Sequence, residues 1–449
     1  MTRTPSFSEN RRQLVHLAMG SFALLLRFIS WWEAAVLAGV ALAFNLYALP
    51  RLAGPHLFRH GESTRRYSSG ITLYPLAILL LICLFPQRLD IVATAWGILA
   101  VGDAVATIVG RYTDGPRIPW NREKSIAGSA AFILFGGAAG VFFCWWCTPA
   151  VVPPPYSWFI VAGPLVAAVA AAAVETIPIR LDDNVSVPAT AAAVMWWLSL
   201  VSEDATAAAA ARAASLLPAA VAVNAAVAAA GYVAGTVSVP GAVCGALLGI
   251  AVTLAAGWGG WALLFATFAA AVIASRLGLR RKTLLGIAEG RGGRRGAANA
   301  LANTGVAGAA AILAAASDAT GPAMIAFVAA LAAGGSDTIA SEIGKAWGRR
   351  TFLFPSFRPV APGTSGAISL EGTAAGVLGA IALGALGVAI GLVPATTLLP
   401  IVAGATVGSF AESVMGATIE APGFVNNDVL NLLNTAIAAA AAVFLAKVL

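Results

Sequence analysis

Two segments of the chain carry the same pattern of residues, and the pattern suits chemistry on a polyphosphate. The first segment, GDAVATIVGRYTDGPRIPWNREKSIAGS, spans residues 102–129, and the second lies within residues 336–373. In each, an Asp inside an apolar run (Asp103 or Asp337) precedes a loop with Arg or Lys, and the loop ends in SIAGS or SLEGT. Two related segments in one chain predict two related active sites.

The basic loop and the small residues after it provide what phosphate oxygens need. Arg and Lys supply positive charge, and free N–H groups at a helix N-terminus bind anions that Gly and Ser allow to come close. The candidate phosphate-binding residues of the first segment are Arg111, Asn121, Arg122, Lys124, Ser125 and Gly128. Those of the second segment are Lys345, Arg358, Ser369, Gly372 and Thr373. The alternative is that these charges only set membrane topology, but the repetition of the loop favours binding.

The two aspartates are expected at, or just inside, the membrane. A carboxylate within hydrocarbon costs about 2.5–3.5 kcal/mol on insertion scales, so it normally faces a polar interior and marks a functional site. The alternative for Asp103 is an ion pair with Arg111 that only holds two helices together. Because Asp337 repeats the same surroundings, we favour a catalytic role for both aspartates.

A third feature, ETIPIRLDDNVSVP at residues 175–188, suggests a metal site. Carboxylate and amide oxygens suit Mg²⁺, which binds through one or two carboxylates plus substrate phosphates. The candidate metal ligands are Asp182, Asp183 and Asn184 in the first half and Glu412, Asn426, Asn427 and Asp428 in the second. Glu175 and Asp103 are the candidate catalytic carboxylates of the first half. The alternative for this stretch is a solvated loop that caps a helix.

The elements that must position these residues are membrane helices. The chain is 59% hydrophobic and 10% charged, whereas soluble domains are about 25% charged. Apolar runs of about 20 residues recur from end to end, long enough to cross a bilayer, and backbone groups in lipid must be paired within a helix. We therefore predict an all-α, polytopic transmembrane protein in two bundles, residues 1–205 and 206–449. The fifteen expected spans lie near residues 14–30, 33–49, 71–85, 90–110, 125–147, 157–174, 187–201, 211–231, 240–256, 259–275, 297–316, 321–334, 372–392, 395–415 and 430–448.

Charge patterning sets the expected orientation. The formal charge of +7 could indicate nucleic acid, but the basic residues occur in alternate loops between apolar runs, as the positive-inside rule requires. We therefore expect no nucleic-acid partner, a cytoplasmic N-terminus, and both sites on the cytoplasmic face of a bacterial membrane. Cys144 and Cys147 have CxxC spacing, but no His or second Cys pair lies nearby, so we interpret them as packing residues.

The motifs also resemble known families. Residues 9–200 resemble the membrane family of phytol kinase and dolichol kinase, related to CTP-using cytidylyltransferases, through RRQLVH, GDAVAT, NREKSIAGS and ETIPIRLDDNVSVP. Residues 212–449 resemble the phytyl-phosphate kinase family through RRGAANALANTG, SDTIASEIG, PGTSGAISLEGTAAG, GATVGSFAESVMGA and NND. Together these likenesses cover nearly the whole chain and suggest a fusion of two kinase-like domains.

The resemblance implies a function for each half. It implies CTP as phosphoryl donor, Mg²⁺ as the metal, and two lipid partners, an isoprenoid alcohol such as phytol or geranylgeraniol and its monophosphate. The N-terminal half would phosphorylate the alcohol and the C-terminal half the monophosphate, as in prenol salvage. It further implies a catalytic role for Glu342 and phosphate binding by Gly363, Thr364 and Ser365.

Two other functions fit parts of the same pattern. A cytidylyltransferase would join CMP to the lipid phosphate and release pyrophosphate, so its products distinguish it from a kinase. A transporter built on a repeat binds its substrate near the bilayer midplane, whereas nearly all the charges of this chain map to one face. The sequence contains neither GxxxxGK[ST] nor a kinase HRD or DFG set, so phosphoryl transfer must use another architecture.

Overall fold

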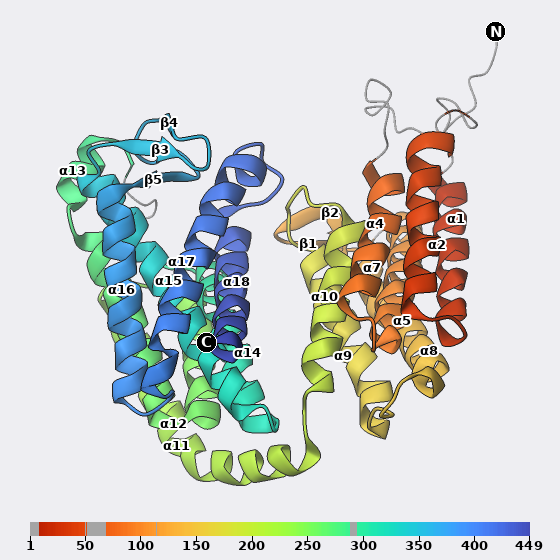
Figure 1. The fold of residues 1–449 in the computed structure, drawn as a ribbon, viewed down its shortest axis with the longest axis horizontal. Helices are drawn as coiled ribbons and strands as arrows, with labels where there is room; N and C mark the ends of the chain where they lie inside the picture. Colours follow the sequence, from red (N-terminus) through yellow and green to blue (C-terminus); the bar gives the residue numbers. More distant parts are fainter. Residues whose placement is uncertain (1–8, 50, 52–68, 114, 288–293) are drawn as a thin grey trace. The chain divides into compact units, whose positions relative to one another are not determined.

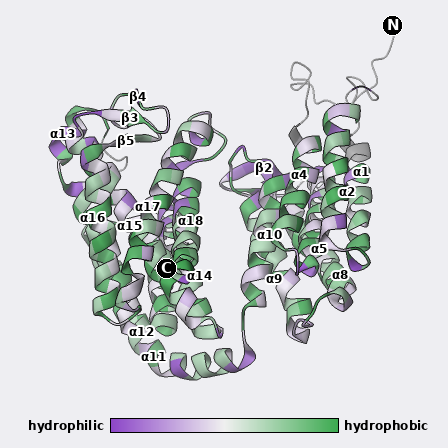
Figure 2. Cartoon of the chain, in the orientation of Figure 1, coloured by the Kyte–Doolittle hydropathy of each residue, from purple (hydrophilic) through white to green (hydrophobic). Residues whose placement is uncertain are grey.

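The contacts within the protein divide it into two compact units, the N-terminal unit Met1–Ser199 and the C-terminal unit Leu200–Leu449. The structure, a computed structural model, describes residues 9–49, 51, 69–113, 115–287 and 294–449. Each unit is a bundle of helices with a small sheet at one end (Figure 1). Hydrophobic residues run along the helices, and many hydrophilic residues lie at helix ends and in the connections (Figure 2). The predicted helical architecture is confirmed, but the small sheets were not expected.

The N-terminal unit is organised around the continuous helical run Leu89–Tyr112, within which Asp103 lies. Every residue of α5 is buried, and α8 and α10 pack against α5. The approach is close because small residues meet: a Cβ on Gly136 would lie 3.1 Å from the Gly102 Cα, which is how Gly favours tight helix packing in membranes. The described elements are α1 (Glu9–Gly20), η1 (Ser21–Arg27), α2 (Trp31–Ala43), η2 (Phe44–Ala48), α4 (Ser69–Leu84), α5 (Leu89–Gly97), η4 (Ile98–Asp103), α6 (Ala104–Tyr112), β1 (Arg117–Ile118), β2 (Asn121–Ser125), α7 (Ile126–Ala131), η5 (Phe132–Gly136), α8 (Gly137–Cys147), η6 (Thr148–Ala150), α9 (Ser157–Glu175) and α10 (Asp183–Ser199).

The C-terminal unit is organised around the helix that carries Asp337. Every residue of α15 from Phe327 to Ser336 is buried, and α15 packs against α14, α16 and α18. The described elements are α11 (Glu203–Val233), α12 (Val239–Arg276), α13 (Leu279–Leu284), α14 (Ala297–Ala316), α15 (Thr320–Trp347), β3 (Thr351–Leu353), β4 (Arg358–Pro359), β5 (Ala367–Ser369), α16 (Leu370–Ala389), η8 (Ala395–Thr397), α17 (Leu398–Met415), η9 (Gly416–Glu420) and α18 (Asn427–Val448). In both units, therefore, the aspartate of the repeated segment lies on the central helix.

The long element α12 is a helical hairpin that reverses at Gly257. The φ of Gly257 is 68°, a conformation that only Gly adopts at little cost. Asn224 of α11 contacts residues on both sides of this point, because its Nδ2 lies 3.5 Å from Thr253 Oγ1 and its Oδ1 accepts from Trp261 Nε1 at 3.0 Å. In a straight helix, the eight residues from Thr253 to Trp261 would advance by about 12 Å, which is too far for one Asn side chain to contact both. The two predicted spans at 240–256 and 259–275 are therefore the two arms of α12.

The repeated segments have the same local geometry. After each central helix the chain forms antiparallel strands, β1–β2 or β4–β3–β5, and then a helix capped by a serine. Ser125 Oγ accepts from Gly128 N at 3.0 Å, and Ser369 Oγ accepts from Gly372 N at 3.1 Å. A Cβ on either glycine would crowd the central helix, 3.1 Å from Ala106 O or 2.6 Å from Ala340 O. The sequence repeat thus corresponds to a repeated structural element.

Eleven helices in the described part of the chain are long and apolar enough to cross a membrane. Two shorter apolar helices, Gln13–Arg27 and Gly70–Leu84, coincide with the predicted first and third spans. Many Leu, Val and Phe side chains on the outsides of the helices are exposed, as expected for contact with lipid rather than water. An integral membrane protein is therefore confirmed, while the count of fifteen spans and the cytoplasmic N-terminus remain predictions.

Orientation can be tested by cysteine labelling in intact cells, with the exposed Cys83 first replaced by Ala. We expect cysteines at Gly115 and Arg349 to be protected from a membrane-impermeant thiol reagent, because both follow the basic ends of central helices. A cysteine at Pro154, in the loop before α9, should react. Labelling of Gly115→Cys from outside would contradict the cytoplasmic placement of the first site.

Candidate active sites

Three carboxylates meet in the N-terminal unit. Oxygens of Asp103, Glu175 and Asp183 all lie within 4.8 Å of one another. Asp103 is the last residue of η4, Glu175 the last of α9, and Asp183 the first of α10. Glu175 and Asp183 therefore lie where a helix ends or begins, whereas Asp103 lies within the continuous helix Leu89–Tyr112. The cluster unites two acidic features that are 72–80 residues apart in the sequence.

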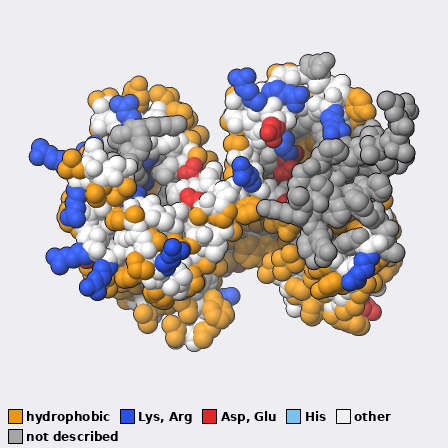
Figure 3. Space-filling view, turned by 90° about the horizontal axis from the view of Figure 1, so that it is seen from above, with side chains coloured by type: hydrophobic (Ala, Val, Ile, Leu, Met, Phe, Trp, Pro, Cys, Tyr) orange, Lys and Arg blue, Asp and Glu red, His pale blue; other side chains and the backbone are white. Residues whose placement is uncertain are grey.

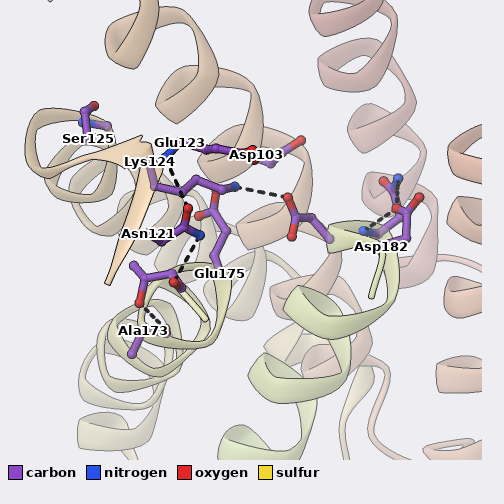
Figure 4. A network of polar contacts seen from close by, with 12 residues as sticks. Asp103, Asn121, Glu123, Lys124, Ser125, Ala173, Glu175 and Asp182 are labelled. Atoms are coloured by element: carbon purple, nitrogen blue, oxygen red, sulfur yellow. Dashed lines mark hydrogen bonds and ion pairs between the residues drawn. The ribbon is translucent and has the colours of Figure 1, made fainter. Parts of the chain in front are cut away.

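Lys124 of β2 inserts its ammonium group into this cluster. Its Nζ lies 2.6 Å from Glu175 Oε1 and 3.1 Å from Asp183 Oδ2 (Figure 4). Burial disfavours the charged ammonium, but Glu175 and Asp183 outweigh this effect and hold the pKa of Lys124 above its usual value. Burial also raises the pKa of Asp183, against the opposing effect of Lys124. Three carboxylate oxygens within 4.8 Å of one another form a ligand set that suits a bound divalent cation.

The strands that carry Lys124 are attached to the end of α9. Trp120 Nε1 donates to Thr176 Oγ1 at 3.2 Å, and Asn121 Nδ2 donates to Thr176 O at 3.2 Å. These bonds place β2 beside Glu175, so Asn121 positions Lys124 instead of facing a phosphate itself. On the opposite side of the cluster, His16 Nε2 lies 3.8 Å from Asp103 Oδ2. His16 was not among the predicted site residues, although RRQLVH contains it.

The remaining predicted residues of the first site lie around the cluster. Asp182 Oδ1 accepts from the backbone N of Asn184 at 3.0 Å and from its Nδ2 at 2.7 Å, and Asp182 lies apart from Glu175 (Figure 4). These two residues form the turn at the start of α10, which is the capping role given above as the alternative. Arg111 and Arg122 are exposed. Ser125 and Gly128 form a helix cap and a close packing contact, so the Gly128 N–H is already used.

The C-terminal unit contains a polar cavity of about 340 Å³. Asp337 and Glu412 line it, and their side chains are hydrogen-bonded to each other. Glu412 Oε2 also accepts from Asn434 Nδ2 of α18 at 2.6 Å. The predicted site residues that line this cavity are Asp337, Lys345, Gly363, Thr364, Ser365, Ser369, Gly372, Thr373, Glu412 and Asn427. Here too a carboxylate of the central helix meets a second carboxylate, from a helix that is distant in the sequence.

Glu342, expected to be catalytic, supports the cavity wall instead of lining it. Its Oε1 lies 2.9 Å from Lys345 Nζ, and its Oε2 pairs with the fully buried Lys282 of α13. Lys345 does line the cavity. Glu342 therefore positions Lys345, much as Glu175 and Asp183 hold Lys124 in the other unit.

Three further expectations for the second site are not met by the geometry. Arg358 of β4 is exposed and does not line the cavity. Asn426 caps α18, because its Oδ1 accepts from Val429 N at 3.0 Å. Asp428 likewise does not line the cavity. Of the NND motif, the structure places only Asn427 at the cavity, because consecutive residues of a helix point in different directions.

Several cavity residues were not predicted as members of the site. They come from the residues just before α14, from its first half, from η9 and from α18, and they are Arg295, Asn299, Asn303, Glu420 and Asn431. Asn299 and Asn303, like Asn427 and Asn431, are four residues apart and so share a helix face. Amides at this spacing on an otherwise apolar helix were the signal that could have identified them. Ser365 connects two cavity segments, because its Oγ donates to Gly416 O at 3.1 Å and contacts Glu420.

Both units carry Lys and Arg side chains on the face shown in Figure 3, and Asp or Glu side chains are visible in recesses of each. The arrangement in each unit is suited to an anionic substrate that reaches a partly buried acidic centre through a basic surface.

Comparison with known proteins agrees with a membrane protein of this kind. Residues 222–439 match the family described as "Integral membrane protein DUF92". An uncharacterized membrane protein of Synechocystis sp. is 36% identical over 204 residues, which are 44% of this chain and 78% of the relative. Protein VTE6, chloroplastic, of Arabidopsis thaliana is 32% identical over 216 residues, 46% of this chain and 65% of that protein. Probable phytol kinase 3, chloroplastic, of Glycine max is 31% identical over 191 residues, 40% of this chain and 60% of that protein.

No solved structure gives a significant match. Two comparisons agree: the family model matches residues 222–439, and the chain covers 78% of a membrane protein to which it is 36% identical. The eleven apolar helices that are long enough to cross a bilayer fit the same family. The chain therefore belongs to the DUF92 family of integral membrane proteins.

Proposed function

We propose that the chain is a bifunctional, CTP-dependent kinase of isoprenoid lipids. The N-terminal unit converts a prenol, such as phytol or geranylgeraniol, to its monophosphate, and the C-terminal unit converts the monophosphate to the diphosphate. The observation that carries the proposal is the repeated element: a central helix with a half-buried aspartate, short strands, a serine-capped helix, and a lysine held beside carboxylates. Relatives named phytol kinase and VTE6 support the lipid substrate class.

The carboxylate cluster of the N-terminal unit is suited to Mg²⁺. Distances of about 2.1 Å from Mg²⁺ to oxygen put opposite ligands about 4.2 Å apart, close to the 4.8 Å within which the three carboxylate oxygens lie. Asp103, Glu175 and Asp183 would hold the ion, and Asp337 and Glu412 would do so in the other unit with help from amide oxygens. A bound Mg²⁺ supplies positive charge that offsets the charge developing on the transferred phosphoryl group.

The residues of the chain have three tasks in the first transfer. A carboxylate, Asp103 or Glu175, takes the proton of the prenol hydroxyl, the hydroxyl oxygen forms a bond to the γ-phosphorus of CTP, and the bond from that phosphorus to the bridging oxygen breaks to release CDP. With a cation held by Glu175 and Asp183, the ammonium group of Lys124 would be able to pair with phosphate oxygens. Positioning and electrostatic stabilisation supply most of the rate in such reactions.

The second transfer needs less acid–base chemistry. The nucleophile is an oxygen of the prenyl monophosphate, which is already an anion, so no base has to take a proton from it. The polar cavity of the C-terminal unit combines the carboxylates of Asp337, Glu412 and Glu420 with Lys345 and several amides. The assignment of alcohol phosphorylation to the N-terminal unit and of monophosphate phosphorylation to the C-terminal unit rests on the family that each half resembles.

A product analysis separates the kinase from the cytidylyltransferase. Purified protein in nanodiscs is supplied with geranylgeraniol, Mg²⁺ and CTP that is labelled on either the γ- or the α-phosphorus. We expect γ-label in lipid monophosphate and diphosphate, no α-label in lipid, and loss of both products on addition of EDTA, restored by excess Mg²⁺. Lipid that carries the α-label would contradict the kinase and support formation of a CDP-lipid.

A further inference from the structure

A second cavity of the C-terminal unit, about 140 Å³ in volume, adjoins the polar cavity and is mostly apolar. It is bordered by α11, both arms of α12, the start of α14 and part of α15. Four residues, Arg295, Asn299, Asn303 and Thr338, line both cavities. Thr338 follows Asp337 directly on α15, so the apolar cavity begins one residue from the proposed acidic centre.

Small residues open this cavity along the first arm of α12. Gly241, Gly245 and Gly249 recur every four residues and therefore share one helix face. A Cβ on Gly241 would lie 2.2 Å from Arg295 O, and one on Gly249 would lie 1.9 Å from Asn224 Oδ1. Gly245 has open space instead, with no neighbouring atom within 4 Å of its Cβ position. The cavity is thus a groove of about 12 Å between the two outer glycines.

The groove has a polar end and an apolar end. Arg295 marks the polar end, where its Nη1 lies 3.3 Å from Asn299 Oδ1. Trp261 and Phe265 stack with ring centroids 5.3 Å apart near the other end, where Trp261 Nε1 is bonded to Asn224. An occupant that fits both ends carries a phosphate beside Arg295 and hydrocarbon along Gly245.

We propose that this groove binds the head-proximal part of the isoprenoid chain of a prenyl monophosphate. The proposal rests on the function proposed above for the C-terminal unit. It would place the phosphate in the polar cavity beside Arg295, the first isoprene unit near Gly241, the second near Gly245 and the rest of the isoprenoid chain in the bilayer. The volume supports this division, because a cavity of about 150 Å³ takes up one benzene molecule.

The volume of the groove also indicates an occupant with a single hydrocarbon chain. A membrane phospholipid carries two acyl chains on one headgroup. A groove with room for about as many carbon atoms as one benzene molecule can hold part of one acyl chain at most. A prenyl phosphate has one chain, and its phosphate is attached directly to it. The groove and the adjoining cavity match that connectivity.

Binding measured without CTP tests the groove separately from the reaction. The probes are dimethylallyl monophosphate, with one isoprene unit, and geranylgeranyl monophosphate, with four, both measured against protein in nanodiscs with empty nanodiscs as background. Gly245→Phe should place its ring in the half of the groove that is farther from Arg295, where the Cβ itself meets open space. Because each buried CH₂ changes affinity about fourfold, we expect the Kd of the longer ligand to rise at least about tenfold and that of the shorter ligand to stay within about twofold.

The matched control is Gly305→Phe on α14, which also has open space at its Cβ position but does not line the groove. It should leave both Kd values unchanged. Equal Kd values for wild type and Gly245→Phe, or an equal loss for both ligands, would overturn the proposal. If the Kd values follow this prediction but no phosphoryl transfer is measured, the groove assignment stands and the kinase function is wrong. If phosphoryl transfer is measured but Gly245→Phe leaves both Kd values unchanged, the kinase function stands and the groove assignment is wrong.

A second measurement uses wild-type protein, so it does not depend on the folding of a variant. Farnesyl monophosphate with a diazirine on its second isoprene unit should, on illumination, label peptides that contain Gly241–Gly249 or Trp261–Phe268. Excess geranylgeranyl monophosphate should suppress this labelling. Labelling confined to lipid-exposed helices outside the groove would contradict the assignment.

Discussion

Asp103→Asn is expected to lower prenol phosphorylation by about 10²–10³-fold and to leave the phosphorylation of added prenyl monophosphate unchanged. The size of the effect is that of removing one preorganised charged group from a phosphoryl-transfer site. Asn preserves the shape of the side chain, so the packing of the central helix should persist. The measurement is the rate of each step with γ-labelled CTP and separately supplied lipids.

Glu123→Gln is the matched control for Asp103→Asn. Glu123 is exposed and adjoins Lys124 in β2, but it does not belong to the cluster of Asp103, Glu175 and Asp183. Its replacement should leave both rates within about twofold. If Asp103→Asn abolished both steps in protein with normal yield and melting temperature, the two units would share one composite site, and the assignment of one reaction to each unit would be wrong.

Asp337→Asn is expected to have the opposite effect, so that prenyl monophosphate accumulates when the protein is given prenol and CTP. Asp337 and Glu412 share a hydrogen bond at the polar cavity, and an Asn at residue 337 can still donate to Glu412. The fold should therefore survive while the cavity loses one of its three carboxylates. We expect the second step to slow by about 10²–10³-fold, measured as the ratio of monophosphate to diphosphate over time.

Asp318→Asn provides the control in this unit. Asp318 is exposed in the turn between α14 and α15, outside the cavity lining, so its charge should not matter to either step. Diphosphate formation that is unaffected by Asp337→Asn would show that the polar cavity is not the site of the second transfer. Glu412→Gln should also cause prenyl monophosphate to accumulate. This second variant tests whether Glu412, like Asp337, is needed for the second phosphoryl transfer.

The sequence was sufficient to identify the repeated element. Its signals are local: an Asp at a fixed distance from a Gly, a basic residue after it, and Ser-x-x-Gly at the next helix start. In the structure Ser125 and Ser369 each cap their helix, and Gly128 and Gly372 each lie against a carbonyl of the central helix. Capping and close packing depend on residues a few positions apart, which is why the pattern could be recognised without coordinates.

The apolar runs were equally informative about the helices. Each predicted span coincides with a described helical segment, because length and hydropathy alone decide whether a stretch must pair its own backbone groups in lipid. The short strands β1–β5 were missed, since strands of two to five residues in polar loops carry no periodicity. Within α12 the sequence indicated two spans, and the positive φ of Gly257 explains how one helical element supplies both.

What only the tertiary structure decided is which polar side chains meet. Asp183 joins Asp103 and Glu175, whereas Asp182, one residue earlier, turns to Asn184; the choice depends on the rotation of α10, which its sequence leaves open. Glu342 is likewise directed to Lys282 and Lys345 instead of the cavity, and Asn431 of α18 reaches the cavity although Asp428 does not. The residue types and their repetition are properties of the sequence, but the side chains that share a site are set by the angle and register at which helices pack, and these depend on contacts between residues far apart in the chain.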